Sequence, residues 1–265
     1  MLQESQDLLA EANELHDFLA TLEETDWGRP TAFKGWTAWD VVAHLHFYDQ
    51  VSLLSLGDEQ AFAERRQELL STFMKGTTNA ELARREYGDW SAAELLERWI
   101  HGCRDMAQQL GDSDPKRRLP WFGPDMGVRM FTTARLMETW AHGQEVYDLL
   151  GMTREPTDRL KSIATIGVKT FAWTFVNRKL EVPGPPPYVR LLAPSGDTWE
   201  WNEPSETECV RGSALDFCHV VTQGRSIADT PLEVVGEVAS AWMAIAQCFA
   251  GGPVDPPKVG ERTGD

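Results

Sequence analysis

The sequence is short of positive charge. Lys and Arg together number 25 against 41 Asp and Glu, so the 265-residue chain carries a formal net charge of −16 at pH 7. A negative field of this size repels nucleic-acid phosphates and anionic membrane surfaces. The only dense basic run, Lys116-Arg117-Arg118, is typical of a solvated loop. We therefore expect neither nucleic-acid nor membrane partners.

Long apolar runs and closely spaced cysteines are also missing. No run of about 18 uncharged apolar residues is present to cross a bilayer, and the N-terminal residues MLQESQDLLAEANEL are amphipathic and acidic. The chain nevertheless contains 42% hydrophobic residues and 11 Trp, which is typical of a globular protein. We expect a cytoplasmic location. The cysteines, which form no CxxC motif, are expected to be buried thiols: Cys103, Cys209, Cys218 and Cys248.

The first two thirds of the chain have the apolar spacing of amphipathic helices. Thr37-x-x-Asp40 and Ser91-x-x-Glu94 have the spacing of capping boxes, in which two side chains bond to each other's backbone N–H groups at a helix start. The 3.6-residue periodicity predicts seven helices. Their approximate ranges are 2–24, 37–56, 58–75, 79–86, 91–110, 130–150 and 156–178.

A stiff segment, Val182-Pro-Gly-Pro-Pro-Pro187, cannot continue a helix and predicts a domain boundary. Beyond it, residues 188–192 and 198–201 flank turn residues and predict a β-hairpin. The remaining predicted elements are a strand over 207–211, a helix over 213–223 and a closing helix over 232–249. The predicted fold is thus mainly α with α+β: a helical domain at 1–181, a small α+β domain at 188–250 and a flexible tail at 251–265.

Two helical segments contain the candidate chemistry. Glu138 and His142 are four residues apart, so they share one helix face and can converge on one point. His44, from another predicted helix, would complete a set of two imidazoles and one carboxylate, which is typical of a catalytic zinc site in a helical bundle. His46 lies about 200° around the helix from His44, so both cannot face one metal. The alternative is an ordinary surface pair between Glu138 and His142.

The same segments carry a resemblance to a known family. Gly35-Trp-Thr-Ala-Trp-Asp-Val-Val-Ala-His44-Leu, followed by Glu138-Thr-Trp-Ala-His142-Gly-Gln-Glu145, resembles the DinB-like superfamily and, within it, the mycothiol-dependent maleylpyruvate isomerase branch. The resemblance implies a metal-binding four-helix bundle followed by a small domain similar to sterol carrier proteins. It also implies that His44, Glu138 and His142 are the metal ligands. Glu145 stands where the pattern more often has Asp, in a position to support a ligand.

What the resemblance implies about function is less specific than what it implies about fold. It indicates an enzyme that uses a divalent metal, zinc in the first instance, and a thiol such as mycothiol for cis–trans isomerisation or S-transfer. The substrate would be a small electrophile that carries a carboxylate. Arg225 resembles a functionally required arginine of this branch, although it also suits the C-terminus of the preceding helix. Metal-assisted hydrolysis and non-catalytic metal or ligand binding are the alternatives.

Overall fold

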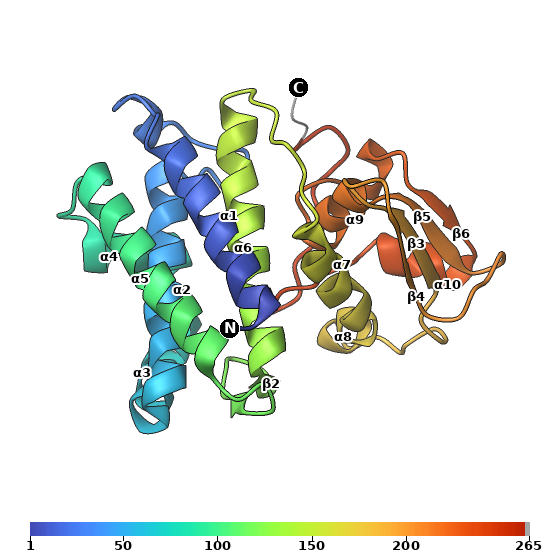
Figure 1. Ribbon diagram of the computed structural model, residues 1–265, viewed down its shortest axis with the longest axis horizontal. Coiled ribbons are helices and arrows are strands. Elements are labelled where there is room, and N and C mark those ends of the chain that lie inside the picture. The colour runs from blue at the N-terminus through green and yellow to red at the C-terminus, as the bar shows by residue number, and fades with distance from the viewer. Residues whose placement is uncertain (263–265) are drawn as a thin grey trace. The chain divides into compact units, whose positions relative to one another are not determined.

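The computed structural model describes residues 1–262 and divides the chain into two compact units, Met1–Leu149 and Leu150–Asp265 (Figure 1). The predicted boundary at 182–187 lies later than this division. The reason is tertiary: the helix at Leu160–Lys169 (α7) packs on the helix at Ala214–Val221 (α9), which gives it partners in the second unit. Among the described residues, no helix is both long and apolar enough to cross a bilayer.

The first unit is a four-helix bundle with two additional helices. The helices of the bundle are α1 (Gln3–Leu19), α2 (Ala38–Gly57), α5 (Ala92–Asp112) and α6 (Val128–Leu149). Helices α1 and α2 each contact both α5 and α6, so the four helices close around one core (Figure 1). The predicted fold class, a helical bundle followed by a small α+β part, is confirmed.

The starts of α2 and α5 are fixed by the capping boxes that the sequence predicts. Thr37 accepts from the N–H of Asp40 while the Asp40 carboxylate accepts from the N–H of Thr37, and Ser91 and Glu94 do the same. A third capping box, at Thr78, starts α4 (Asn79–Tyr87). Local contacts thus fix the residue at which α2 and α5 each begin, and this determines which side chains of each helix face the core.

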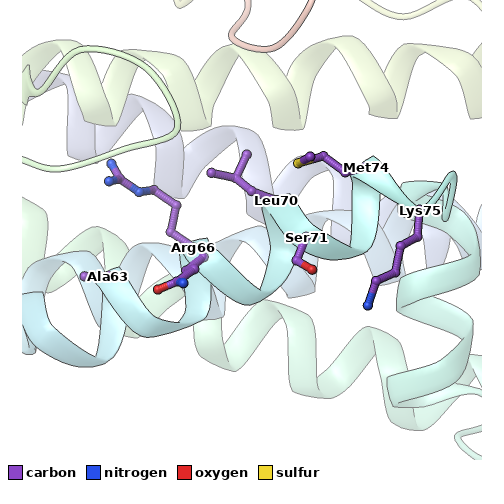
Figure 2. Close-up of a pocket in the computed structure, with 7 residues that line it drawn as sticks. Ala63, Arg66, Leu70, Ser71, Met74 and Lys75 are labelled. Carbon is purple, nitrogen blue, oxygen red and sulfur yellow. The ribbon is translucent and has the colours of Figure 1, made fainter.

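Helix α3 (Glu59–Met74) lies at the side of the bundle, and its outer face carries an open hollow (Figure 2). All the lining residues come from this helix and its C-cap: Ala63, Arg66, Gln67, Leu70, Ser71, Met74 and Lys75. No imidazole, thiol or carboxylate is among them, so the hollow lacks the side chains that usually bind metals. A short hairpin of β1 (Arg118–Leu119) and β2 (Met126–Gly127), absent from the sequence prediction, precedes α6.

A buried ion pair joins two helices of the bundle. The Arg135 guanidinium on α6 donates from Nη2 and Nε to Asp49 Oδ1 on α2, at 2.9 and 3.1 Å. Both side chains are almost inaccessible, at 4% and 1% exposed. Asp49 also accepts from the Trp99 indole N–H of α5, at 3.2 Å. Three helices therefore meet at one carboxylate.

The second unit combines a four-stranded sheet with short helices. The strands are β3 (Tyr188–Leu192), β4 (Thr198–Trp201), β5 (Cys209–Ser213) and β6 (Glu233–Val235), in the order β4-β3-β5-β6. Strands β3 and β4 form the predicted hairpin, whereas β3 and β5 pair in parallel. Helix α9 contacts both β3 and β5. All four cysteines of the chain are buried, as expected.

Two predicted helices of this unit are wrong in extent. The helix predicted over 156–178 is two helices, α7 and α8 (Phe171–Asn177), which divide at Thr170, where the hydroxyl donates to the carbonyls of Ile166 and Gly167. The closing helix predicted over 232–249 is shorter. Its first part is strand β6, and α10 (Glu237–Met243) begins after Gly236, whose φ of +98° favours glycine.

The segment predicted to be a flexible tail is held against the second unit as far as residue 262. The Val254 N–H donates to Gln247 Oε1 at 3.0 Å, and the Gln223 side chain donates to the Val254 carbonyl at 2.8 Å. Arg262 in turn donates to the Gln223 carbonyl. The buried amides of Gln223 and Gln247 thus provide hydrogen-bond partners for the backbone at Gly252 and Val254.

We expect Arg135→Met to destabilise the first unit strongly, because it leaves the Asp49 carboxylate buried without its cation. The expected loss in free energy of unfolding is about 3–5 kcal/mol. Urea unfolding followed by circular dichroism measures it. The control is Arg190→Met, which removes an exposed pair with Glu200 and should cost under about 1 kcal/mol. Equal losses in the two variants would contradict the role given to the buried pair.

Candidate metal centre

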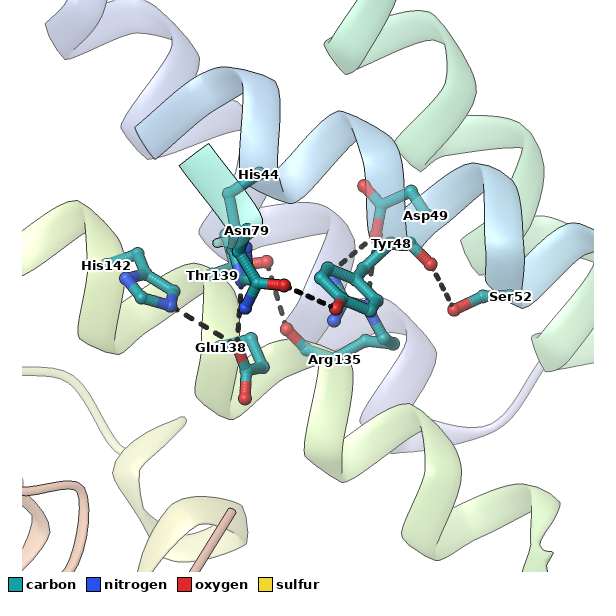
Figure 3. Close-up of polar contacts among 9 residues, drawn as sticks. All are labelled: His44, Tyr48, Asp49, Ser52, Asn79, Arg135, Glu138, Thr139 and His142. Atoms are coloured by element: carbon teal, nitrogen blue, oxygen red, sulfur yellow. Dashed lines mark hydrogen bonds and ion pairs between the residues drawn. The ribbon is translucent and has the colours of Figure 1, made fainter. Parts of the chain in front are cut away.

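Three side chains of the bundle converge on one point between α2 and α6. His44 projects from α2, and Glu138 and His142 project from successive turns of α6 (Figure 3). Nε2 of His44 and Nε2 of His142 each lie 3.3 Å from Oε2 of Glu138. Each residue offers a ligand atom within 4.8 Å of the other two, and this is the one group of three such residues found in the described part of the chain.

Local interactions place His44 at this point. It lies one turn after Asp40, whose carboxylate accepts from Arg84 on α4 at 2.6 and 2.7 Å as well as from Thr37. On α6, the Arg135 that binds Asp49 lies one turn before Glu138. The capping box thus fixes the start of α2, and the buried ion pair fixes α2 against α6.

Aromatic rings surround the two imidazoles. Trp36 stacks on His142 at 5.3 Å and lies tilted against His44 at 5.0 Å between ring centroids. Phe33 packs edge-on against His142 at 5.2 Å, and Tyr48 lies 4.8 Å from His44. The Tyr48 hydroxyl donates to Asn79 Oδ1 at 3.0 Å (Figure 3). These rings limit the access of water and hold both imidazoles in place.

The surroundings favour the protonation states that bind metals. Burial, together with the neighbouring His142, lowers the pKa of His44 to about 4, so its ring is neutral at pH 7. Burial alone would raise the pKa of Glu138, but hydrogen bonds from His142 and His44 outweigh it and hold that pKa well below its ordinary value. Glu138 is therefore anionic. Its side chain keeps 23% of its exposure, which leaves a route to solvent.

The donor set fits a divalent metal. Two imidazole nitrogens and one carboxylate oxygen are the ligands of many catalytic zinc sites, in which a fourth position stays open. The alternative, an ordinary surface pair between Glu138 and His142, does not describe these residues, because His44 is 6% exposed and faces the same carboxylate oxygen.

The structure separates the other residues that the sequence singles out. His46 points away from Glu138 and packs edge-on against Tyr87, with ring centroids 5.0 Å apart. Burial, with Arg98 nearby, lowers the pKa of His46 to about 4. Glu145 is buried on α6 one turn after His142. Arg225 lies in the second unit, just after α9, and its N–H donates to the His219 carbonyl at 3.2 Å.

The sequence reasoning did not identify the residues that surround the cluster. Trp36 and Tyr48 lie within or beside the motif that contains His44, but helical spacing alone does not show which way their rings point. Phe33 precedes α2 in a loop, and Asn79 comes from α4, so only the tertiary fold brings them here. The sequence held one signal for the ion pair with Asp49, which is Arg135 in the middle of a predicted helix. An arginine that is buried there needs an acidic partner.

The fold and the cluster of two histidines and one carboxylate define a helical-bundle protein with a candidate metal centre. Comparison with known proteins identifies its family. The chain belongs to the family described as mycothiol maleylpyruvate isomerase N-terminal domain, which matches residues 8–147.

The similarity to known proteins covers both units of the chain. The uncharacterized proteins Rv0036c of Mycobacterium tuberculosis strain ATCC 25618 / H37Rv and MT0041 of strain CDC 1551 / Oshkosh are each 40% identical over 247 residues, which is 93% of this chain and 95% of theirs. The crystal structure of the mycothiol-dependent maleylpyruvate isomerase matches with a TM-score of 0.52 and 13% identity over 82% of this chain and 87% of that chain. A histidine-to-alanine mutant of that isomerase matches with a TM-score of 0.51 at the same identity and coverage. These structures share the fold.

Removal of the shared carboxylate should abolish metal binding. We expect the purified protein to retain about one zinc ion per chain after dialysis against zinc-free buffer, and Glu138→Gln to retain almost none, because two neutral imidazoles hold zinc weakly. Elemental analysis by mass spectrometry measures the metal content. Glu64→Gln, on the exposed side of α3, is the control and should bind as the unchanged chain does. Equal zinc in both variants would show that Glu138 is not a ligand.

Proposed function

We propose that this protein is a metal-dependent enzyme that uses a low-molecular-weight thiol of the mycothiol type to isomerise a small electrophile bearing a carboxylate. The observation that carries the proposal is the convergence of His44, Glu138 and His142 on one point of the bundle. Membership in the mycothiol maleylpyruvate isomerase N-terminal domain family supports it. A reduced thiol cofactor also agrees with a cytoplasmic location, which we include in the proposal.

His44, Glu138 and His142 would hold the metal, for which zinc is the best match to these donors. Bound there, zinc would supply a positive centre that deprotonates a thiol at neutral pH, against an ordinary pKa near 8.5. The protein then needs no cysteine of its own for catalysis. This agrees with the burial of all four cysteines.

The remaining chemistry belongs to the thiolate and the substrate. Addition of the sulfur to one carbon of a conjugated cis double bond forms a C–S bond and moves the π electrons onto the adjoining carbonyl. Rotation about the resulting single bond, followed by loss of the thiolate, restores the double bond in the trans form. Transfer of sulfur to the substrate would begin with the same nucleophile, and the product would then keep the sulfur.

The described side chains have definable parts in this reaction. Trp36 and Phe33 pack on His142, so they exclude water from one side of the site. Tyr48 remains protonated, because burial and then the charge of Glu138 raise its pKa, and its hydroxyl is held by Asn79. Arg225 would bind the substrate carboxylate. In the second unit, Arg225 Nη1 donates to the Gly224 carbonyl at 2.8 Å.

Turnover of maleylpyruvate with and without mycothiol tests the proposal. We expect isomerisation that requires the thiol and falls at least about 100-fold in His142→Ala, because that variant loses a metal ligand. His101→Ala, which alters an exposed histidine of α5, should keep full activity. Absorbance of the substrate and chromatography of the product measure the reaction.

The other outcomes of this assay identify the alternatives. Turnover without thiol would indicate a metal-assisted hydrolase, and a product that retains sulfur would indicate an S-transferase. No turnover with any electrophile tried, in protein that still binds metal, would support a binding protein.

Arg225→Gln separates substrate binding from a structural role. If Arg225 binds the carboxylate in ground state and transition state alike, KM rises about tenfold while kcat changes little, and Arg225→Lys restores part of the loss. Steady-state kinetics measures both constants. Arg190→Gln, on the exposed side of β3, is the matched control. A loss of stability in urea with KM unchanged would assign Arg225 to the end of α9 alone.

A further inference from the structure

Helix α2 carries a second polar site on the side opposite His44. A hollow of about 480 Å³ lies there within the first unit. Its lining residues come from α2, α4, α5 and the turn before α5: His46, Gln50, Tyr87, Trp90, Arg98 and His101. None of them takes part in the proposed reaction.

His46 is a buried imidazole whose Nδ1 has no hydrogen-bond partner among the described residues. The residue is 6% exposed. A buried polar atom of this kind costs free energy unless something satisfies it. Gly102 of α5 lets the Gln50 amide approach the helix closely beside this ring. A Cβ at this position would lie 2.8 Å from Nε2 of Gln50 and 3.9 Å from Nδ1 of His46.

The hollow also has a cation at its edge. The Arg98 guanidinium lies over the Trp90 ring, 4.4 Å from its centroid, and the charge of Glu94 acts on it, although no carboxylate of the described residues lies within ion-pair distance. Glu94, one turn earlier, is held by Ser91, whose N–H and hydroxyl each donate to it at 3.0 Å. In a chain with a net charge of −16, an arginine held on a ring with no described carboxylate within ion-pair distance favours an anionic ligand.

The floor of the hollow is aromatic. Tyr87 and Trp90 stack on each other with centroids 4.7 Å apart and planes 26° apart, and Arg98 lies over the Trp90 ring. His46 packs against both rings. The stacked rings therefore offer their edges to a ligand, and the apolar part of an aromatic ligand can pack against these edges with its charge toward Arg98.

We propose that this hollow binds a small organic monoanion with a flat apolar part, such as an aromatic carboxylate. Arg98 binds the carboxylate, the edges of the Tyr87 and Trp90 rings contact the apolar part, and the His46 ring and the Gln50 amide line the remainder of the hollow. A single arginine with no lysine among the lining residues suits one negative charge better than a phosphate. The site is separate from the candidate metal centre, and the inference does not depend on the proposed function.

Benzoate is the probe for this site. We expect it to bind the full-length protein and to shift the ring NMR signals of His46 and His101 with one common dissociation constant. Six histidines give few signals, so His46→Gln and His101→Gln can assign them. Arg98→Gln should weaken binding about tenfold, through loss of a charge-assisted hydrogen bond. Arg85→Gln, an exposed arginine of α4 outside the hollow, should leave it unchanged.

Three results would overturn the proposal. The first is no saturable binding of benzoate in the millimolar range at fixed ionic strength. The second is equal affinity in Arg98→Gln and Arg85→Gln. The third is a shift confined to the signals of His44 and His142, which would place benzoate at the candidate metal centre. Benzoate binding that persists in Glu138→Gln, with the same His46 shifts, would support a separate site.

Discussion

The ion pair between Asp49 and Arg135 determines how α2 and α6 lie against each other, and the candidate metal centre depends on that placement. Apolar side chains tolerate small shifts between helices, whereas a buried charge pair keeps its stability only with its hydrogen bonds in place. Asp49 is five residues after His44, and Arg135 is three residues before Glu138. A pair fixed at one level of the bundle therefore brings the imidazole and the carboxylate together about one turn away (Figure 3).

Helix α2 is buried on nearly every side although it contains many polar residues. Each of its buried polar groups therefore needs a partner from the surrounding helices. Asp40 has Arg84, Asp49 has Arg135, and Ser55 donates to the Pro120 carbonyl at 2.7 Å. His44 faces Glu138 through its Nε2, and Nδ1 of both His44 and His46 is without a hydrogen-bond partner among the described residues. The two histidines thus divide α2 into a side that faces the metal cluster and a side that faces the aromatic hollow.

Features that depend on neighbours in the sequence could be predicted. The capping boxes at Thr37 and Ser91, the shared face of Glu138 and His142, and the hairpin before residue 202 all arise from spacings of a few residues. Features that depend on distant partners could not. Residues 233–235 form a strand because Val234 pairs with Val210 of β5, a contact that no local pattern reveals. The rings around the metal cluster come from the loop before α2 and from α2 itself, and the loop rings meet His142 of α6, so this convergence is also tertiary.

The pairing of the helices also bears on how the chain folds as it is synthesised. Helix α1 packs on α5 and α6, so it is synthesised before either of its partners in the first unit. Until α6 has emerged as far as residue 149, the apolar face of α1 has only part of its native cover, which α5 provides. The bundle can then close only as a whole, while the nascent chain exposes that face to chaperones or to other chains.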